Sequence, residues 1–160
     1  MEAQPHNIML LSKTSEYGIR AMLHLAGVGG DVYLPVKRIS KDLDISFHFL
    51  TKIFQQLTRA ELVDSYRGPN GGVRLRCEAR SIAVKDILVA LEGDDLFTKC
   101  VLGLPECGEG HPCPLHEHWA RSRMQIETMF GGKSLIDLGA ELRSGGFRLR
   151  ATGEWTEPTK

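Results

Sequence analysis

The stretch Val36-Lys-Arg-Ile-Ser-Lys-Asp-Leu43, the turn Asp44-Ile-Ser46 and the run that follows to Ala60 decide the fold. Pro35 suits the start of the first short helix, and Ser46 suits the N-cap of the second. In the second helix, apolar residues recur at three- and four-residue spacing and must pack against other helices: Phe49, Leu50, Ile53, Phe54 and Leu57. Two short helices joined by a tight turn are typical of a helix–turn–helix.

The segments on either side complete a winged helix–turn–helix. A first helix is predicted over Ser12–Val28 from apolar residues at helical spacing, and Gly29-Gly30 ends it. Two strand-like runs, Glu61–Tyr66 and Val73–Cys77, flank a loop in which Asn70-Gly71 accept positive φ, so they predict a β-hairpin. A hairpin directly after a helix–turn–helix is typical of a wing.

The second half of the chain is predicted to be helical around one irregular loop. Helices are expected over Ile82–Leu91 and Leu115–Phe130, with the loop Thr98–Pro114 between them, and Ser134-Leu-Ile-Asp137 fits a capping box for a last short helix. We therefore predict a mainly α fold with a small β-hairpin, made of a winged helix–turn–helix over 9–80 and a region over 81–143 with a long C-terminal helix. Residues 1–8 and 144–160 are predicted to be flexible tails.

Composition bounds the class of protein. The 160 residues are 42% hydrophobic and 25% charged, which suits one ordinary domain. No apolar run approaches the roughly 20 residues that cross a bilayer, and the first residues do not resemble a secretory signal, so a cytoplasmic protein is expected. The net charge is zero, but the two halves of the chain differ. Residues 1–80 contain 11 Lys and Arg and 8 Asp and Glu, whereas residues 81–160 contain 9 Lys and Arg and 12 Asp and Glu. A basic first half suits a polyanionic partner.

The second short helix and the wing are the candidate DNA-binding surface. Polar residues near the helix start are placed to reach base edges, because a helix in the major groove contacts bases with its first turns. Later helix positions and the wing are expected to meet phosphates. The candidate residues are Lys37, Arg38, Ser46, His48, Thr51, Lys52, Gln55, Arg59, Arg67, Asn70 and Arg74. The plainer interpretation is that they form the solvated side of a small helical domain.

Three cysteines in one loop form a second candidate site, with the pattern Cys100-x6-Cys107-x5-Cys113-x2-His116, while Cys77 stands apart. Thiolates are soft ligands that select zinc, copper(I) and iron–sulfur clusters. Zinc fingers usually use tighter cysteine pairs, so the long gaps favour a loop wrapped around a larger inorganic core. A zinc-stabilised module and a redox enzyme that uses the same cysteines remain alternatives.

Over roughly residues 9–140 the chain resembles the bacterial winged-helix iron–sulfur regulators of the IscR and NsrR type. The resemblance rests on Leu11–Tyr17, Phe49–Leu57, the wing Arg67–Gly72 and the three-cysteine loop. It implies a homodimer built on the long helix after the cysteines, with one iron–sulfur cluster per subunit, either 2Fe–2S or 4Fe–4S.

The same resemblance implies two candidates for a fourth ligand. One is Glu16 from the first helix of the partner subunit, and the other is His116, three residues after the last cysteine. Glu16 is preferred at this stage, because a ligand that crosses the interface could move the recognition helices directly. The expected function is that of a DNA-binding repressor, not an enzyme, on a pseudo-palindromic promoter site. Its affinity would be controlled by a cluster that senses nitric oxide, redox state or cluster supply.

Overall fold

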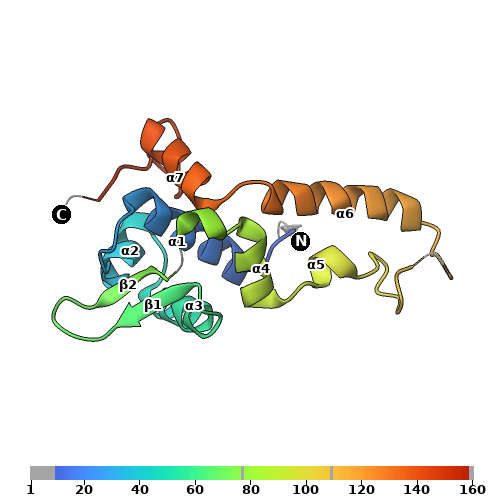
Figure 1. The fold of residues 1–160 in the computed structure, drawn as a ribbon, viewed down its shortest axis with the longest axis horizontal. Coiled ribbons are helices and arrows are strands. Elements are labelled where there is room, and N and C mark those ends of the chain that lie inside the picture. Colours follow the sequence, from blue (N-terminus) through green and yellow to red (C-terminus); the bar gives the residue numbers. More distant parts are fainter. Residues whose placement is uncertain (1–9, 77, 109, 159–160) are drawn as a thin grey trace, which may run out of the picture.

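The computed structural model describes residues 10–76, 78–108 and 110–158, so the predicted tail over 1–8 and Cys77 lie outside the described residues. Figure 1 shows a helical body with a hairpin on one side and a long helix projecting from the other. The elements are α1 (Lys13–Val28), α2 (Val36–Leu43), α3 (Phe47–Arg59), β1 (Val63–Tyr66), β2 (Gly72–Leu75), a 3-10 turn (Ala79–Ser81), α4 (Val84–Glu92), α5 (Asp95–Thr98), α6 (His116–Gly131) and α7 (Leu135–Ser144). The prediction of a mainly α winged helix–turn–helix is confirmed.

The first helix, α1, forms the centre of the body. The side chain of Ser12 caps it by accepting from the backbone N–H of Ser15 at 3.2 Å, and Gly29 ends it with φ 65°. Ala21, Met22, Leu25 and Ala26 are buried in the core against neighbouring helices. Because α1 contacts α2, α3, α4, α7 and β2, its position sets that of the helix–turn–helix.

The two helices of the helix–turn–helix form where the apolar spacing predicts. The turn places Asp44 in the left-handed conformation, with φ 53°, and Ser46 occupies the N-cap position of α3. Ser46 makes no side-chain capping hydrogen bond, so its expected capping role is not seen. The apolar face of α3 is buried, and Phe49 at its edge packs edge-on against Tyr17 with ring centroids 5.4 Å apart.

The wing is the predicted hairpin, with Val63 opposite Leu75 and Tyr66 opposite Gly72 in an antiparallel pair. The expectation of positive φ at Asn70-Gly71 is wrong, because within this loop the positive φ belongs to Gly68, at 152°. Gly71 is needed for space instead: a Cβ there would lie 2.4 Å from the backbone oxygen of Tyr66.

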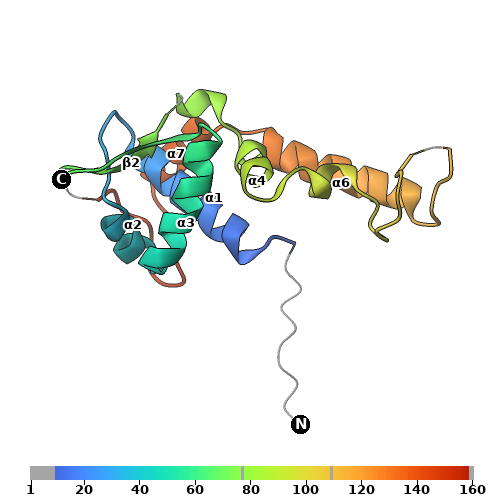
Figure 2. The same ribbon diagram turned by 90° about the horizontal axis from the view of Figure 1, so that it is seen from below.

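The second half adds α4 and α7 to the body and extends α6 away from it. A capping box starts α7, in which the Asp137 carboxylate accepts from the Ser134 backbone at 3.2 Å and the Ser134 hydroxyl accepts from the Asp137 backbone, as predicted. The short helix α5 was not predicted from the sequence. None of the residues of α6 is buried, and Figures 1 and 2 show this helix reaching beyond the body.

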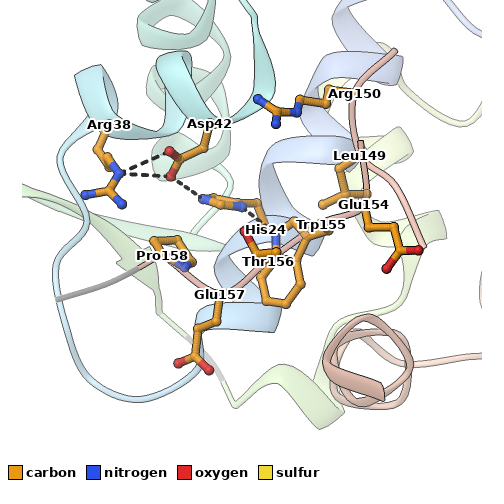
Figure 3. A pocket seen from close by; sticks show the side chains of 10 residues that line it. All are labelled: His24, Arg38, Asp42, Leu149, Arg150, Glu154, Trp155, Thr156, Glu157 and Pro158. Atoms are coloured by element: carbon orange, nitrogen blue, oxygen red, sulfur yellow. Dashed lines mark hydrogen bonds and ion pairs between the residues drawn. The ribbon is translucent and has the colours of Figure 1, made fainter. Parts of the chain in front are cut away.

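The C-terminal segment differs from the flexible tail predicted over 144–160. Residues 145–158, which we call the C-terminal strap, run back across α1. Leu149 is buried, and the Trp155 indole nitrogen donates to Nδ1 of His24 at 2.8 Å (Figure 3). The segment has no regular apolar spacing, and its contacts with the body come from Leu149, Trp155 and the carbonyl oxygen of Leu149, which accepts from Arg20.

Candidate cysteine site and DNA-binding surface

The loop between α5 and α6 brings together the three cysteines that the sequence singles out. The sulfurs of Cys100 and Cys113 lie 3.7 Å apart, and the sulfur of Cys107 lies 3.6 Å from Nδ1 of His116. Cys100 is buried, whereas Cys107 and Cys113 are half-buried, and all three are free thiols. The backbone N–H of His116 donates to the carbonyl oxygen of Cys113 at 2.9 Å, so the last cysteine is tied to the start of α6.

The surroundings of Cys100 favour a thiolate. Hydrogen bonding from the backbone of Leu102 is the main cause that lowers the pKa of the Cys100 thiol. Burial opposes it, and hydrogen bonds with Leu104, Cys113 and Cys107 make smaller contributions in the lowering direction. Backbone amides directed at a sulfur are also the groups that tune iron–sulfur centres.

Two side chains of α6, one helical turn apart, hold the entry to the cysteine loop. The Trp119 indole nitrogen donates to the carbonyl oxygen of Lys99 at 2.8 Å. Nη1 of Arg123 donates to the carbonyl oxygen of Thr98 at 3.0 Å and lies 3.7 Å from the sulfur of Cys107. The loop is therefore attached to α6 through an indole and a guanidinium.

The two candidates for a fourth ligand lie in different places. His116 is in the site, against Cys107. Glu16 lies in the first turn of α1, where its carboxylate pairs with Lys13 at 2.9 Å. Glu16 was expected to act from the partner subunit, and a single chain does not test that arrangement.

The donor set fits thiolate-bound metal atoms. When two thiolates bind one tetrahedral metal atom, each sulfur lies about 2.3 Å from the metal and the two sulfurs lie about 3.8 Å apart. The distance between the sulfurs of Cys100 and Cys113 is close to this value. Among the described residues, no group of three or more His, Cys, Asp or Glu side chains is arranged to hold a single ion. Cys100 is hydrogen-bonded to both Cys113 and Cys107, so the three thiols and His116 lie in one cluster of possible metal ligands.

The recognition-helix candidates divide by exposure. His48, Lys52, Gln55 and Arg59 project from α3 into solvent. Thr51 is half-buried and donates its hydroxyl to the carbonyl oxygen of Phe47 at 2.8 Å, which leaves its oxygen free to act as an acceptor. Outside α3, four further candidates are also exposed: Lys37, Ser46, Arg67 and Asn70.

Arg38 and Arg74 are engaged inside the protein. Nε of Arg38 donates to Asp42 at 3.0 Å. Arg74 pairs with Asp64 at 3.5 Å and stacks over Tyr33 with its guanidinium 4.7 Å from the ring centroid. These contacts with acidic side chains reduce the positive charge that Arg38 and Arg74 present to a phosphate.

The model of the family Rrf2, described as an iron-dependent transcriptional regulator, matches residues 11–141. The chain belongs to the Rrf2 family. It is 33% identical over 130 residues to the HTH-type transcriptional regulator IscR of Vibrio campbellii, covering 81% of this chain and 77% of that protein. It is 37% identical to IscR of Photobacterium profundum over 130 residues, which cover 81% and 75%.

Two solved structures agree with this placement of the Rrf2 chain. CymR, the global cysteine regulator of B. subtilis, superimposes with a TM-score of 0.70 at 28% identity, covering 82% of this chain and 96% of that one. IscR of T. potens has a TM-score of 0.69 at 27% identity, covering 84% and 88%. This Rrf2 protein is therefore a DNA-binding transcriptional regulator rather than an enzyme. None of the helices among its described residues is long and apolar enough to cross a membrane.

The sequence did not reveal the roles of Trp119 and Arg123 in this Rrf2 regulator. Their spacing places both on one side of the helix, which is visible in the sequence. Their partners are carbonyl oxygens of the loop about 20 to 25 positions earlier, and no local pattern identifies such partners.

Proposed function

We propose that this Rrf2 regulator holds an iron–sulfur cluster through Cys100, Cys107 and Cys113, and that the cluster controls its affinity for promoter DNA. The observation that carries the proposal is the gathering of three thiols in one loop beside His116 at the start of α6, the helix that holds the loop. When bound, the cluster supplies an iron–sulfur core that reacts with nitric oxide and oxidants. Cys100, the most buried of the three, lies at the inner side of this site.

His116 is the fourth ligand that the geometry of one chain supports, because its ring nitrogen already lies beside Cys107. Glu16, preferred on the sequence alone, would have to exchange its ion pair with Lys13 and come from the partner subunit. Substitutions at the two positions separate these arrangements.

A homodimer built on α6 is the second part of the proposal. Met124 and Met129 are 62% and 59% exposed on a helix that packs only lightly on its own body. Exposed apolar side chains on a projecting helix favour burial against a second copy. In such a dimer, α6 would carry both the cysteine loop and the contact between subunits.

DNA binding is proposed for α3 and the wing. Figure 1 shows both on the side of the body opposite α7, and most of the candidate side chains there are exposed. In a dimer, two recognition helices must enter successive major grooves about one DNA turn apart, so the spacing of the subunits sets affinity. This arrangement suits a pseudo-palindromic promoter site, where binding would repress transcription in the cytoplasm.

The link between the site and DNA runs through α6. Trp119 and Arg123 fix the cysteine loop to this helix, so a change in the loop shifts the element that is proposed to set subunit spacing. A coupling of about 1–3 kcal/mol, ordinary for allostery, alters affinity about 5- to 150-fold.

Protein purified without oxygen tests the proposal. We expect a coloured protein with a visible absorption band and with iron and sulfide in comparable amounts. We also expect addition of nitric oxide to change both the spectrum and the affinity for DNA selected from a random duplex library. A colourless protein that contains zinc would show the alternative, a zinc-stabilised DNA-binding module. A coloured protein that binds DNA with the same affinity before and after its cluster is destroyed would contradict the proposed control of DNA binding.

A further inference from the structure

A chain of polar contacts joins the C-terminal strap to α2, the first helix of the helix–turn–helix. Nε1 of Trp155 donates to Nδ1 of His24 at 2.8 Å, and Nε2 of His24 lies 3.3 Å from Oδ2 of Asp42. The Asp42 carboxylate accepts from Nε of Arg38 at 3.0 and 3.2 Å. Figure 3 shows these side chains in sequence, from the strap through α1 to α2.

A second side chain of α1 makes the same connection. Arg20 donates through Nη2 to the carbonyl oxygen of Leu43, the last residue of α2, at 2.7 Å. It also donates through Nε to the carbonyl oxygen of Leu149 in the strap. Two residues of α1, one helical turn apart, therefore each contact the strap on one side and α2 on the other.

The body provides a fitted seat for Trp155. Gly27 lies within α1, and a Cβ at this position would be 2.6 Å from Cζ2 of Trp155. Glycine is a poor residue inside a helix, so its presence here is explained by the ring that packs on it. The strap also lines an open pocket of about 190 Å³, together with His24, Arg38 and Asp42.

His24 is 1% exposed and is one of only two buried polar or charged residues in the described chain. A buried imidazole needs partners at both ring nitrogens. Nδ1 meets this need by accepting from Trp155, whereas Nε2 lies 3.3 Å from Oδ2 of Asp42 in an ion-pair contact without hydrogen-bond geometry. The strap thus completes the surroundings of a buried group whose other partner belongs to α2.

We infer that the C-terminal strap is a positioning element for the helix–turn–helix, which holds α2 in its DNA-binding position through Trp155, His24 and Asp42. The strap lies after the segment that the Rrf2 family model matches, which ends at residue 141. The inference concerns DNA binding by the winged helix and does not depend on the cysteine site.

Trp155→Phe is the central test, because it removes the donor to His24 and keeps an aromatic side chain at this position of the strap. The matched control is Trp119→Phe: Trp119 is the other tryptophan of the chain, and it donates to Lys99 in the cysteine loop. Amide hydrogen exchange of the full-length protein is measured across α2, α3 and α6. Affinity is measured for a duplex that the wild-type protein selects from a random library.

We expect Trp155→Phe to speed exchange of α2 amides about five- to tenfold, the effect of losing one hydrogen bond, and to weaken DNA binding by a similar factor. Trp119→Phe should leave exchange of α2 unchanged. Gly27→Ala should act like Trp155→Phe, because its methyl group displaces the indole. In a Trp155→Ala background the same Gly27→Ala change should have no further effect on α2.

Three outcomes would overturn the inference. One is wild-type exchange of α2 and wild-type DNA affinity in both Trp155→Phe and Gly27→Ala. Another is faster exchange of α2 with unchanged DNA affinity, which would make the strap a purely structural element. The last is equally faster exchange in every helix, which would show a general loss of stability rather than a specific effect on α2.

Discussion

Nη1 of Arg123 lies 3.7 Å from the sulfur of Cys107, and the same atom donates to the carbonyl oxygen of Thr98 at 3.0 Å. One guanidinium thus holds both the entry of the cysteine loop and one of its thiols. Because Arg123 belongs to α6, the proposed cluster site and the proposed dimer helix share a charged contact. We expect a change at either end of this contact to affect the other.

Arg123→Gln is expected to speed loss of the visible absorption band in the presence of a chelator about tenfold, since partners of metal ligands contribute on this scale. Arg123→Lys should retain part of the effect through its charge. Arg121→Gln is the control, because the hydrogen bond of Arg121 among the described residues stays within its own helix, to the carbonyl oxygen of Glu117 at 3.4 Å. Equal lifetimes in all four proteins would show that Arg123 does not support the site.

Replacing any one of Cys100, Cys107 or Cys113 with Ala is expected to abolish the visible band or strongly reduce it, because each is proposed as a cluster ligand from the same loop. Cys77→Ala should leave it unchanged, since this cysteine lies outside the loop. Absorption spectra and iron counts of protein prepared without oxygen are the measurement. Full colour in any of the three loop variants would remove that cysteine from the ligand set.

His116→Ala is expected to alter the cluster spectrum more than Glu16→Ala, because His116 is beside Cys107 in the same chain. Removing one of four ligands should leave a protein that still binds the cluster but loses it more easily. The reverse order of effects would place the fourth ligand on Glu16 of the partner subunit.

Lys52→Ala and Arg67→Ala are expected to affect DNA binding differently. Lys52 lies exposed in the early part of α3, so its loss should change the preferred base at one position, at about 1–3 kcal/mol. Arg67 lies in the exposed loop of the wing, so its loss should weaken binding to all sequences and reduce the salt slope by about one unit. Titrations on a selected duplex and its single-base variants, at several salt concentrations, distinguish the two. Unchanged binding in both would show that this face does not contact DNA.

Stability is expected to fall when the pH drops below about 6.5. Burial lowers the pKa of His24 despite the opposing effect of Asp42, so the unfolded chain takes up a proton before the folded chain does. The stabilisation is complete above the ordinary pKa of histidine and is lost as the pH falls through the lower pKa of the folded state. Urea unfolding at several pH values measures this loss, and His24→Gln should reduce it. An equally steep loss in His24→Gln would assign the pH dependence to other groups.

Local spacing alone determined much of this protein. The apolar repeats of α1 and α3, the capping box at Ser134 and the glycine-containing turn of the hairpin specify their elements, because each depends on residues a few positions apart. The three cysteines of the site were evident for the same reason. Partners far apart in sequence were decided only by packing.

Tertiary structure decided which polar groups are engaged and where the chain end lies. The bond between His24 and Trp155 joins positions 131 residues apart, and it turned a predicted loose tail into a strap. The acidic partners of Arg38 and Arg74, and the loop carbonyls that Arg123 holds, were likewise set by the approach of separate elements. Hydrogen bonds and ion pairs act over a few ångströms, so a sequence pattern shows that a group can bond, while the fold determines to what.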